Sequence, residues 1–218
     1  YELFCSIDIH NNTGKNPYFC CVNRLDKASL GLASFFETDA LFFEDPPNAL
    51  STFMGRFCPS ITLECGLSGD ELGIKRAEKL LEKLLLLEGR EDFSLYRFEN
   101  NIYKSFGKFK IPESTDVEFI SRKSDFNTLN GNKVLFFEDL EKFNLKPVPV
   151  GTEFGYIKED CISFIRAESE FGEDLFNEYF KVENCKIISI KKFYAAMITK
   201  NIDVAKSDCF FYFLKNIE

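Results

Sequence analysis

The stretch Ile7-Asp8-Ile9-His10-Asn11-Asn12-Thr13-Gly14 lies where a hydrophobic run passes into a polar turn, and it holds the only histidine of the 218 residues. Asp8 and His10 are two positions apart, and on a strand this spacing places both side chains on one face. A carboxylate beside an imidazole fixes the tautomer of a metal-ligating histidine. The pair therefore predicts a metal site or, as the alternative, a structural histidine with a satisfied partner.

Short apolar runs alternate with helical patterns from residue 1 to about residue 90. This alternation is typical of β-α-β units around a largely parallel sheet. We expect strands at 3–9, 19–22, 40–43 and 61–65, a helix over 26–36, a short helix from the Asp45-Pro46-Pro47 turn to about Arg56, and a longer helix after Ser68-Gly69-Asp70-Glu71. The apolar stripe of the longer helix should face the core, and it comprises Leu72, Ala77, Leu80, Leu81, Leu84 and Leu85.

The pattern changes after the polar segment Gly89-Arg90-Glu91-Asp92. From there the chain consists of short segments rich in Phe, Ile, Val and Tyr, separated by turns such as Asn130-Gly131-Asn132 and Val150-Gly151-Thr152. Such a pattern is typical of an antiparallel β domain. We therefore expect an α/β domain over residues 1–92 and a smaller, mostly antiparallel β domain over residues 93–218.

Composition excludes several classes of partner. The net charge is −8 and the longest basic run is a doublet, which argues against a nucleic-acid surface. The most apolar window, Leu80–Leu87, is interrupted by Glu82 and Lys83 and is far shorter than the roughly 20 residues of a membrane span. The eight cysteines lack C-x-x-C spacing, so we expect reduced thiols in a cytoplasmic protein rather than disulfides or a zinc knuckle.

A second candidate residue lies in Pro59-Ser60-Ile61-Thr62-Leu63-Glu64-Cys65-Gly66. Glu64 closes an apolar strand just before a glycine turn, and ligand sites in open α/β sheets gather at the carboxyl ends of strands. A carboxylate there is costly unless it has a partner, a metal or water to serve. Glu64 is therefore a candidate general base, with a solvated glutamate at a strand end as the alternative.

Several of these motifs together resemble one known family. The run from Asp8 to Gly14, followed by Asn16-Pro17, resembles the middle zinc-site motif of the succinylglutamate desuccinylase/aspartoacylase family, a branch of the zinc carboxypeptidase-like hydrolases. Its next two landmarks resemble Phe43-Glu44-Asp45-Pro46-Pro47 and Thr62-Leu63-Glu64-Cys65-Gly66. The entry into its β domain and a later turn resemble Leu95-Tyr96-Arg97 and Val150-Gly151-Thr152.

The resemblance implies a fold, a reaction and roles for particular residues. The fold would be a zinc carboxypeptidase-like α/β domain with a parallel or mixed sheet, followed by a smaller β domain. The reaction would be hydrolysis of an N-acyl amino acid such as succinylglutamate or acetylaspartate. His10 would be a zinc ligand supported by Asp8, and Glu64 would take a proton from the zinc-bound water. Candidate substrate contacts are Asn11, Asn12 and Arg56, although a surface arginine is an equal interpretation of Arg56.

The sequence also departs from the family pattern. The family's other zinc ligands come from an upstream His-x-x-Glu motif, and this sequence has no second histidine. We therefore expect weak zinc binding by these residues, and we expect an N-terminal portion to be missing, because Tyr1 opens inside a predicted strand. Two alternatives stay open: a metal-free relative that binds a small metabolite or a protein, and a purely structural β-rich interaction module. An oligomer is compatible with every one of these hypotheses.

Overall fold

The computed structural model of the chain describes residues 4–44, 49–87, 89, 91–123 and 129–217. The predicted Asp45-Pro46-Pro47 turn, the start of the first predicted strand and Arg90 fall outside the described residues. The chain divides into two compact units. The first comprises Tyr1–Asn12, Pro17–Ser105 and Asn216–Glu218, and the second comprises Thr13–Asn16 and Phe106–Lys215. The main change of unit comes later than residue 92, because the short turn η1 (Phe93–Leu95) packs against helix α1 of the first unit.

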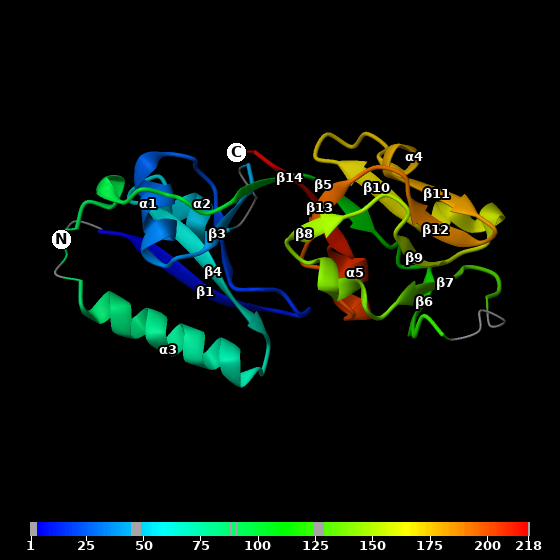
Figure 1. Cartoon of the computed structure of the whole chain (residues 1–218), viewed down its shortest axis with the longest axis horizontal. Helices are drawn as coiled ribbons and strands as arrows, with labels where there is room; N and C mark the ends of the chain where they lie inside the picture. Colours follow the sequence, from blue (N-terminus) through cyan, green and yellow to red (C-terminus); the bar gives the residue numbers. More distant parts are fainter. Residues whose placement is uncertain (1–3, 45–48, 88, 90, 124–128, 218) are drawn as a thin grey trace. The chain divides into compact units, whose positions relative to one another are not determined.

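The first unit is built on a mixed sheet (Figure 1). Its strands, in spatial order, are β1 (Ser6–Asn12), β4 (Ser60–Leu67), β2 (Phe19–Val22), β3 (Asp39–Phe42) and the first part of β5 (Ile102–Lys110). All neighbours are parallel except β2 and β4, which run antiparallel. The expected α/β class is therefore confirmed. One boundary differs, because β1 continues through His10 to Asn12 and the histidine lies within the strand.

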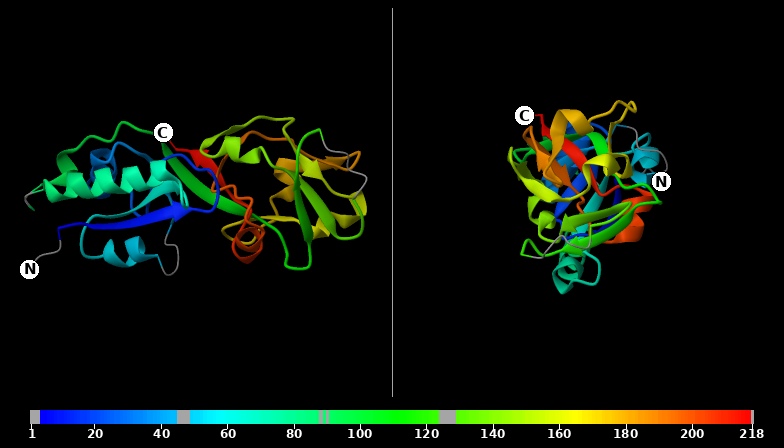
Figure 2. Two further views of the ribbon diagram at one scale, coloured as in Figure 1. Left: turned by 90° about the horizontal axis from the view of Figure 1, so that it is seen from below. Right: turned by 90° about the vertical axis from the view of Figure 1, so that its right-hand side faces the viewer.

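Three helices of the first unit follow the predicted positions: α1 (Lys27–Phe35), α2 (Leu50–Met54) and α3 (Glu71–Leu85). Asp26 caps α1, because its Oδ1 accepts hydrogen bonds from the amides of Ala28 and Ser29. Helices α1 and α3 contribute to a core with one face of β2 and β4, whereas α2 lies on the other face (Figure 2). On that face the hydroxyl groups of Ser51 in α2 and Thr62 in β4 form a hydrogen bond. The polar residues of β4 thus share their face with α2.

The burial of the apolar side chains of α3 differs from the prediction. Leu80 is buried and Leu84 packs at the edge of the core, but Leu72, Leu81 and Leu85 are exposed. The expectation of a wholly core-facing stripe was wrong. The physical reason is that the described residues of the first unit cover only one side of the stripe, the side that carries Leu80.

The second unit is a β structure, as predicted. One sheet has the order β11 (Phe180–Glu183), β12 (Lys186–Ser189), β9 (Glu153–Tyr156), β7 (Lys133–Phe137) and β6 (Asp116–Ile120). The other contains the second part of β5 with β10 (Arg166–Ser169), β14 (Phe211–Asn216), β13 (Phe193–Ala196) and β8 (Lys146–Val148). Its short helical segments are η2 (Leu140–Phe143), η3 (Glu159–Phe164), α4 (Phe176–Tyr179) and α5 (Ile202–Ser207). Nearly all strand pairs are antiparallel; β6 with β7 is parallel.

Phenylalanine fills the core of the second unit. Phe109 is fully buried and lies 5.0 Å from the ring of Phe211 in a stacked pair, and its ring edge meets Phe180 at 5.4 Å. Aromatic pairs in these geometries add stability beyond the area they bury. The 26 phenylalanines of the sequence therefore serve mainly to fill the core of this β unit.

All eight cysteines lie among the described residues, where they carry free thiols. Among the described residues, no helix combines the length and the apolar character that crossing a membrane requires.

Candidate active site

Glu64 lies inside the sheet of the first unit, near the carboxyl end of β4. β1 and β2 flank β4, and the register places His10 and Phe19 beside Glu64 on the two sides. Only 6% of the residue is exposed. The carboxylate is therefore a buried charged group and not the solvated strand-end glutamate of the alternative interpretation.

His10 lies between two carboxylates. Its Nε2 is 3.0 Å from Asp8 Oδ2, and its Nδ1 is 3.8 Å from Glu64 Oε1. Both contacts lie within ion-pair distance when the imidazole is protonated. The side chain of His10 is 52% exposed, so the imidazole is open to solvent on one side. The predicted placement of Asp8 and His10 on one face is confirmed.

Asn12 is the partner of Glu64 that the sequence interpretation missed. Its Nδ2 donates a hydrogen bond of 2.9 Å to Glu64 Oε2, and both residues are buried. The register between β1 and β4 shifts between His10 and Asn12, which brings Asn12 opposite Leu67. Strand alternation places Asp8, His10 and Asn12 on one face, but it does not identify the bond to Glu64, which depends on this register shift.

Burial dominates the electrostatics of Glu64. Removal of the carboxylate from water raises its pKa to about 7, while His10 acts in the opposite direction and Asp8 adds to the rise. Cys21, which pairs with Thr62 across the β2–β4 ladder, contributes to this apolar environment, and burial raises the pKa of its thiol well above the usual value. Glu64 can thus hold or release a proton near neutral pH.

The described residues do not form a complete zinc centre. A catalytic zinc site takes three protein ligands. No group of three His, Cys, Asp or Glu side chains within the described part of the chain is placed to hold a metal ion. His10 also directs one ring nitrogen at Asp8 and turns the other toward Glu64. The groups available for chemistry at this site are therefore the carboxylates of Asp8 and Glu64, the imidazole of His10 and the amide of Asn12.

The remaining predicted site residues lie at different distances from this cluster. Asn11 is an exposed residue of β1 that follows His10 in the sequence. Arg56 is not brought together with Glu64, because it follows α2 and lines a pocket with Ser60, the first residue of β4. Contact of Asn11 or Arg56 with a substrate stays a prediction.

The sequence matches no family model and no curated protein. Solved structures do match in fold. The crystal structure of murine aminoacylase 3 aligns with a TM-score of 0.52 and 14% identity over 98% of this chain and 63% of that chain. The crystal structure of the succinylglutamate desuccinylase/aspartoacylase from Rhodobacter sphaeroides aligns with a TM-score of 0.53 and 11% identity over 98% of this chain and 59% of that one.

This is the desuccinylase/aspartoacylase fold. The resemblance inferred from the sequence motifs is thereby confirmed for the fold, since both alignments cover nearly the whole chain. The chain spans about six-tenths of the length of these solved structures, 63% and 59% respectively. At such sequence identities the likeness establishes the desuccinylase/aspartoacylase fold alone, and the chemistry has to be argued from the residues of the site.

Proposed function

We propose that this chain is part of a hydrolase that cleaves the amide bond of an N-acyl amino acid, with Glu64 as the general acid and base. The observation that carries the proposal is the buried Glu64 carboxylate at the end of β4, held by Asn12 and adjacent to His10. The likeness in fold to an aminoacylase and to a desuccinylase/aspartoacylase supports this reaction class over others.

The proposed reaction runs through a proton cycle at Glu64. The carboxylate accepts a proton from a water molecule as the water oxygen bonds to the amide carbon of the substrate. The same carboxyl group then delivers that proton to the amine nitrogen as the carbon–nitrogen bond breaks. The acid and the free amino acid leave, and the carboxylate is restored. Asp8 holds the imidazole of His10 beside Glu64.

We propose zinc binding for the whole protein and not for the described residues alone. The proposed role of His10 as a zinc ligand needs further ligands, and the described residues do not supply a complete set. No step of the proton cycle above is routed through a metal ion.

The test compares hydrolysis of N-acetylaspartate and N-succinylglutamate, with and without added zinc, by detection of the released amine. Glu64→Gln should lower the rate by about 100-fold or more, which is the usual contribution of general acid–base catalysis. The matched control is Glu71→Gln, which removes an exposed glutamate from the start of α3 and should leave the rate unchanged. Equal rates in the wild type and Glu64→Gln would contradict the proposal.

A second candidate is a metal-free relative that binds a small acidic metabolite without chemistry. It is favoured by the incomplete ligand set among the described residues. Calorimetric binding of the same two compounds without release of amine, in the presence of zinc, would support the binding protein and contradict the hydrolase.

A further inference from the structure

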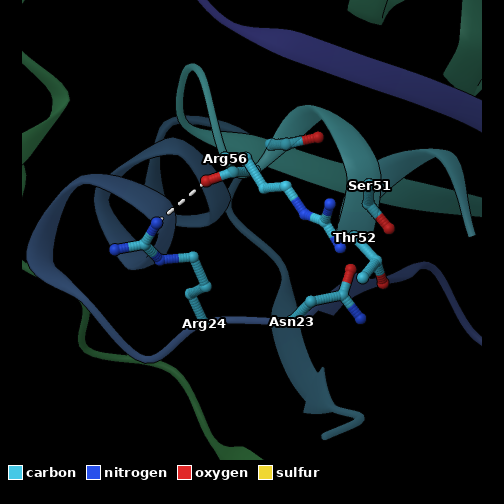
Figure 3. A pocket seen from close by; sticks show the side chains of 7 residues that line it. Asn23, Arg24, Ser51, Thr52 and Arg56 are labelled. Carbon is cyan, nitrogen blue, oxygen red and sulfur yellow. Dashed lines mark hydrogen bonds between the residues drawn. The ribbon is translucent and has the colours of Figure 1, made fainter. Parts of the chain in front are cut away.

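A polar pocket lies in the first unit (Figure 3). It is at the start of β4, whereas Glu64 lies toward the other end of that strand. Its volume is about 180 Å³, and its lining residues are Asn23, Arg24, Ser51, Thr52, Gly55, Arg56 and Ser60. Ser60 begins β4 and Glu64 follows four residues later, which separates their backbones by about 13 Å along the strand. The pocket is therefore distinct from the Glu64 site.

Two buried polar atoms in this pocket lack a hydrogen-bond partner among the described residues. They are Ser60 Oγ and Asn23 Oδ1. Ser60 is only 3% exposed, and the orientation of the Asn23 amide is fixed because its Nδ2 donates to the carbonyl oxygen of Phe43. An unpaired polar group in the interior is destabilising, so a ligand that pairs with both atoms would recover that free energy.

The two arginines of the pocket differ in the contacts that their guanidinium groups make. Arg24 is occupied, because its Nε lies 2.8 Å from Asp26 Oδ2 and its Nη1 donates to the carbonyl oxygen of Gly55. The guanidinium of Arg56 extends toward Asn23 and Thr52 (Figure 3), and within the described part of the chain it makes no ion pair. Among the described residues Arg56 thus has no carboxylate partner, and its guanidinium offers a positive charge and several N–H donors to the space in the pocket.

We propose that this pocket binds a small oxyanion, a carboxylate or phosphate, that also carries a hydroxyl or protonated oxygen. The anionic oxygens would accept from Arg56, whose planar group suits such anions, and from Ser60 Oγ. The hydroxyl would donate to Asn23 Oδ1, which can only accept. Drug-sized ligands occupy about 300–1,000 Å³, so this smaller pocket fits a compact acid and excludes a nucleotide. The sequence resemblance assigned Arg56 to the substrate of Glu64, whereas the pocket gives it a different ligand.

Calorimetric titration with glycolate and with inorganic phosphate tests the proposal, with chloride at equal ionic strength as the blank. Glycolate pairs a carboxylate with a hydroxyl, and monohydrogen phosphate pairs anionic oxygens with one O–H, so the two arms distinguish the carboxylate from the phosphate source. We expect saturable binding of at least one of them. Arg56→Gln should weaken it about tenfold or more, because a hydrogen bond to a charged partner is lost.

Two further variants complete the experiment. Arg97→Gln removes an exposed arginine outside the pocket and should leave the dissociation constant unchanged. Ser60→Ala should weaken binding while leaving the ligand-free protein at least as stable, because it removes a buried hydroxyl that has no partner. The proposal is overturned if neither anion binds, if Arg56→Gln binds as tightly as the wild type, or if Arg97→Gln loses affinity equally.

Discussion

Asn12 is the residue whose contribution is simplest to isolate. Its amide is the buried donor to Glu64 Oε2. At pH 8 the Asn12→Ala variant should lower the free energy of unfolding by about 1–3 kcal/mol, because a buried acceptor loses its partner. The neighbouring Asn11 is exposed, so Asn11→Ala should stay within about 0.5 kcal/mol of the wild type. Urea denaturation followed by circular dichroism measures both, and equal losses would contradict a specific role for Asn12.

The sequence allowed part of this site to be predicted. Alternation along a strand was enough to place Asp8 with His10. The glycine after Cys65 indicated that Glu64 lies near the carboxyl end of its strand, but the predicted end at Gly66 was wrong, because β4 continues to Leu67. The bond from Asn12 to Glu64 could not be predicted in the same way, because it depends on the shift in register after His10. Such a shift is set by the pairing of two distant strands, and local periodicity does not encode it.

At the scale of elements, helix α1 depends on its first capping residue. Desolvation, the largest influence, would raise the pKa of Asp26, but hydrogen bonds from Ser29 and Ala28 and the charge of Arg24 together lower it below the ordinary value. A lowered pKa in the folded state means that the charged carboxylate stabilises the fold above pH ~4. That stabilisation is lost as the pH falls through the folded-state pKa.

The Asp26→Ala variant should therefore cost about 1 kcal/mol at pH 7. The difference from the wild type should shrink as the pH falls below about 4. Asp26→Asn keeps a capping oxygen without the charge and should lose less at pH 7 than the alanine variant. Denaturation curves at a series of pH values measure these differences, and a pH-independent gap between wild type and Asp26→Ala would refute the role of the charge.

Gly31 sets how closely α1 approaches the turn η1. A Cβ at Gly31 would lie 1.7 Å from the carbonyl oxygen of Phe93, which is backbone and cannot swing aside. We expect Gly31→Ala to destabilise the first unit by more than about 1 kcal/mol, although alanine is the better helix former. At Gly73 in α3 the nearest atom is at 3.2 Å, so Gly73→Ala should change the thermal midpoint far less. Similar midpoints for the two variants would contradict this packing argument.

The elements themselves were largely predictable, and their burial was not. Asp70 marked the start of α3 because aspartate oxygens cap helices, and helical spacing placed α1 within residues 26–36. The exposure of Leu81 on α3 could not be predicted, because a hydrophobic stripe indicates which face is apolar and not how much of that face another element covers.

At the scale of the whole molecule, the second unit depends on its aromatic core. Phe109 is fully buried, with the rings of Phe136 at 6.1 Å and Phe211 at 5.0 Å. Phe109→Ala should cost about 3–5 kcal/mol through lost burial and the cavity it leaves. Phe171 is 90% exposed, so Phe171→Ala is the matched control and should be nearly neutral. Amide exchange in β7 and β9 reports the loss, and unchanged protection there in Phe109→Ala would contradict it.

The position of the candidate site within the sheet has a consequence for motion. β4 is bonded to a strand on each side, whereas β1 is bonded to β4 alone among the described strands. Local opening takes less free energy at a strand held by one ladder than at a strand held by two. We therefore expect β1 to open locally at a lower free energy than β4. The contact between His10 and Glu64 should then break by opening of β1 while the carboxylate stays in place in the sheet.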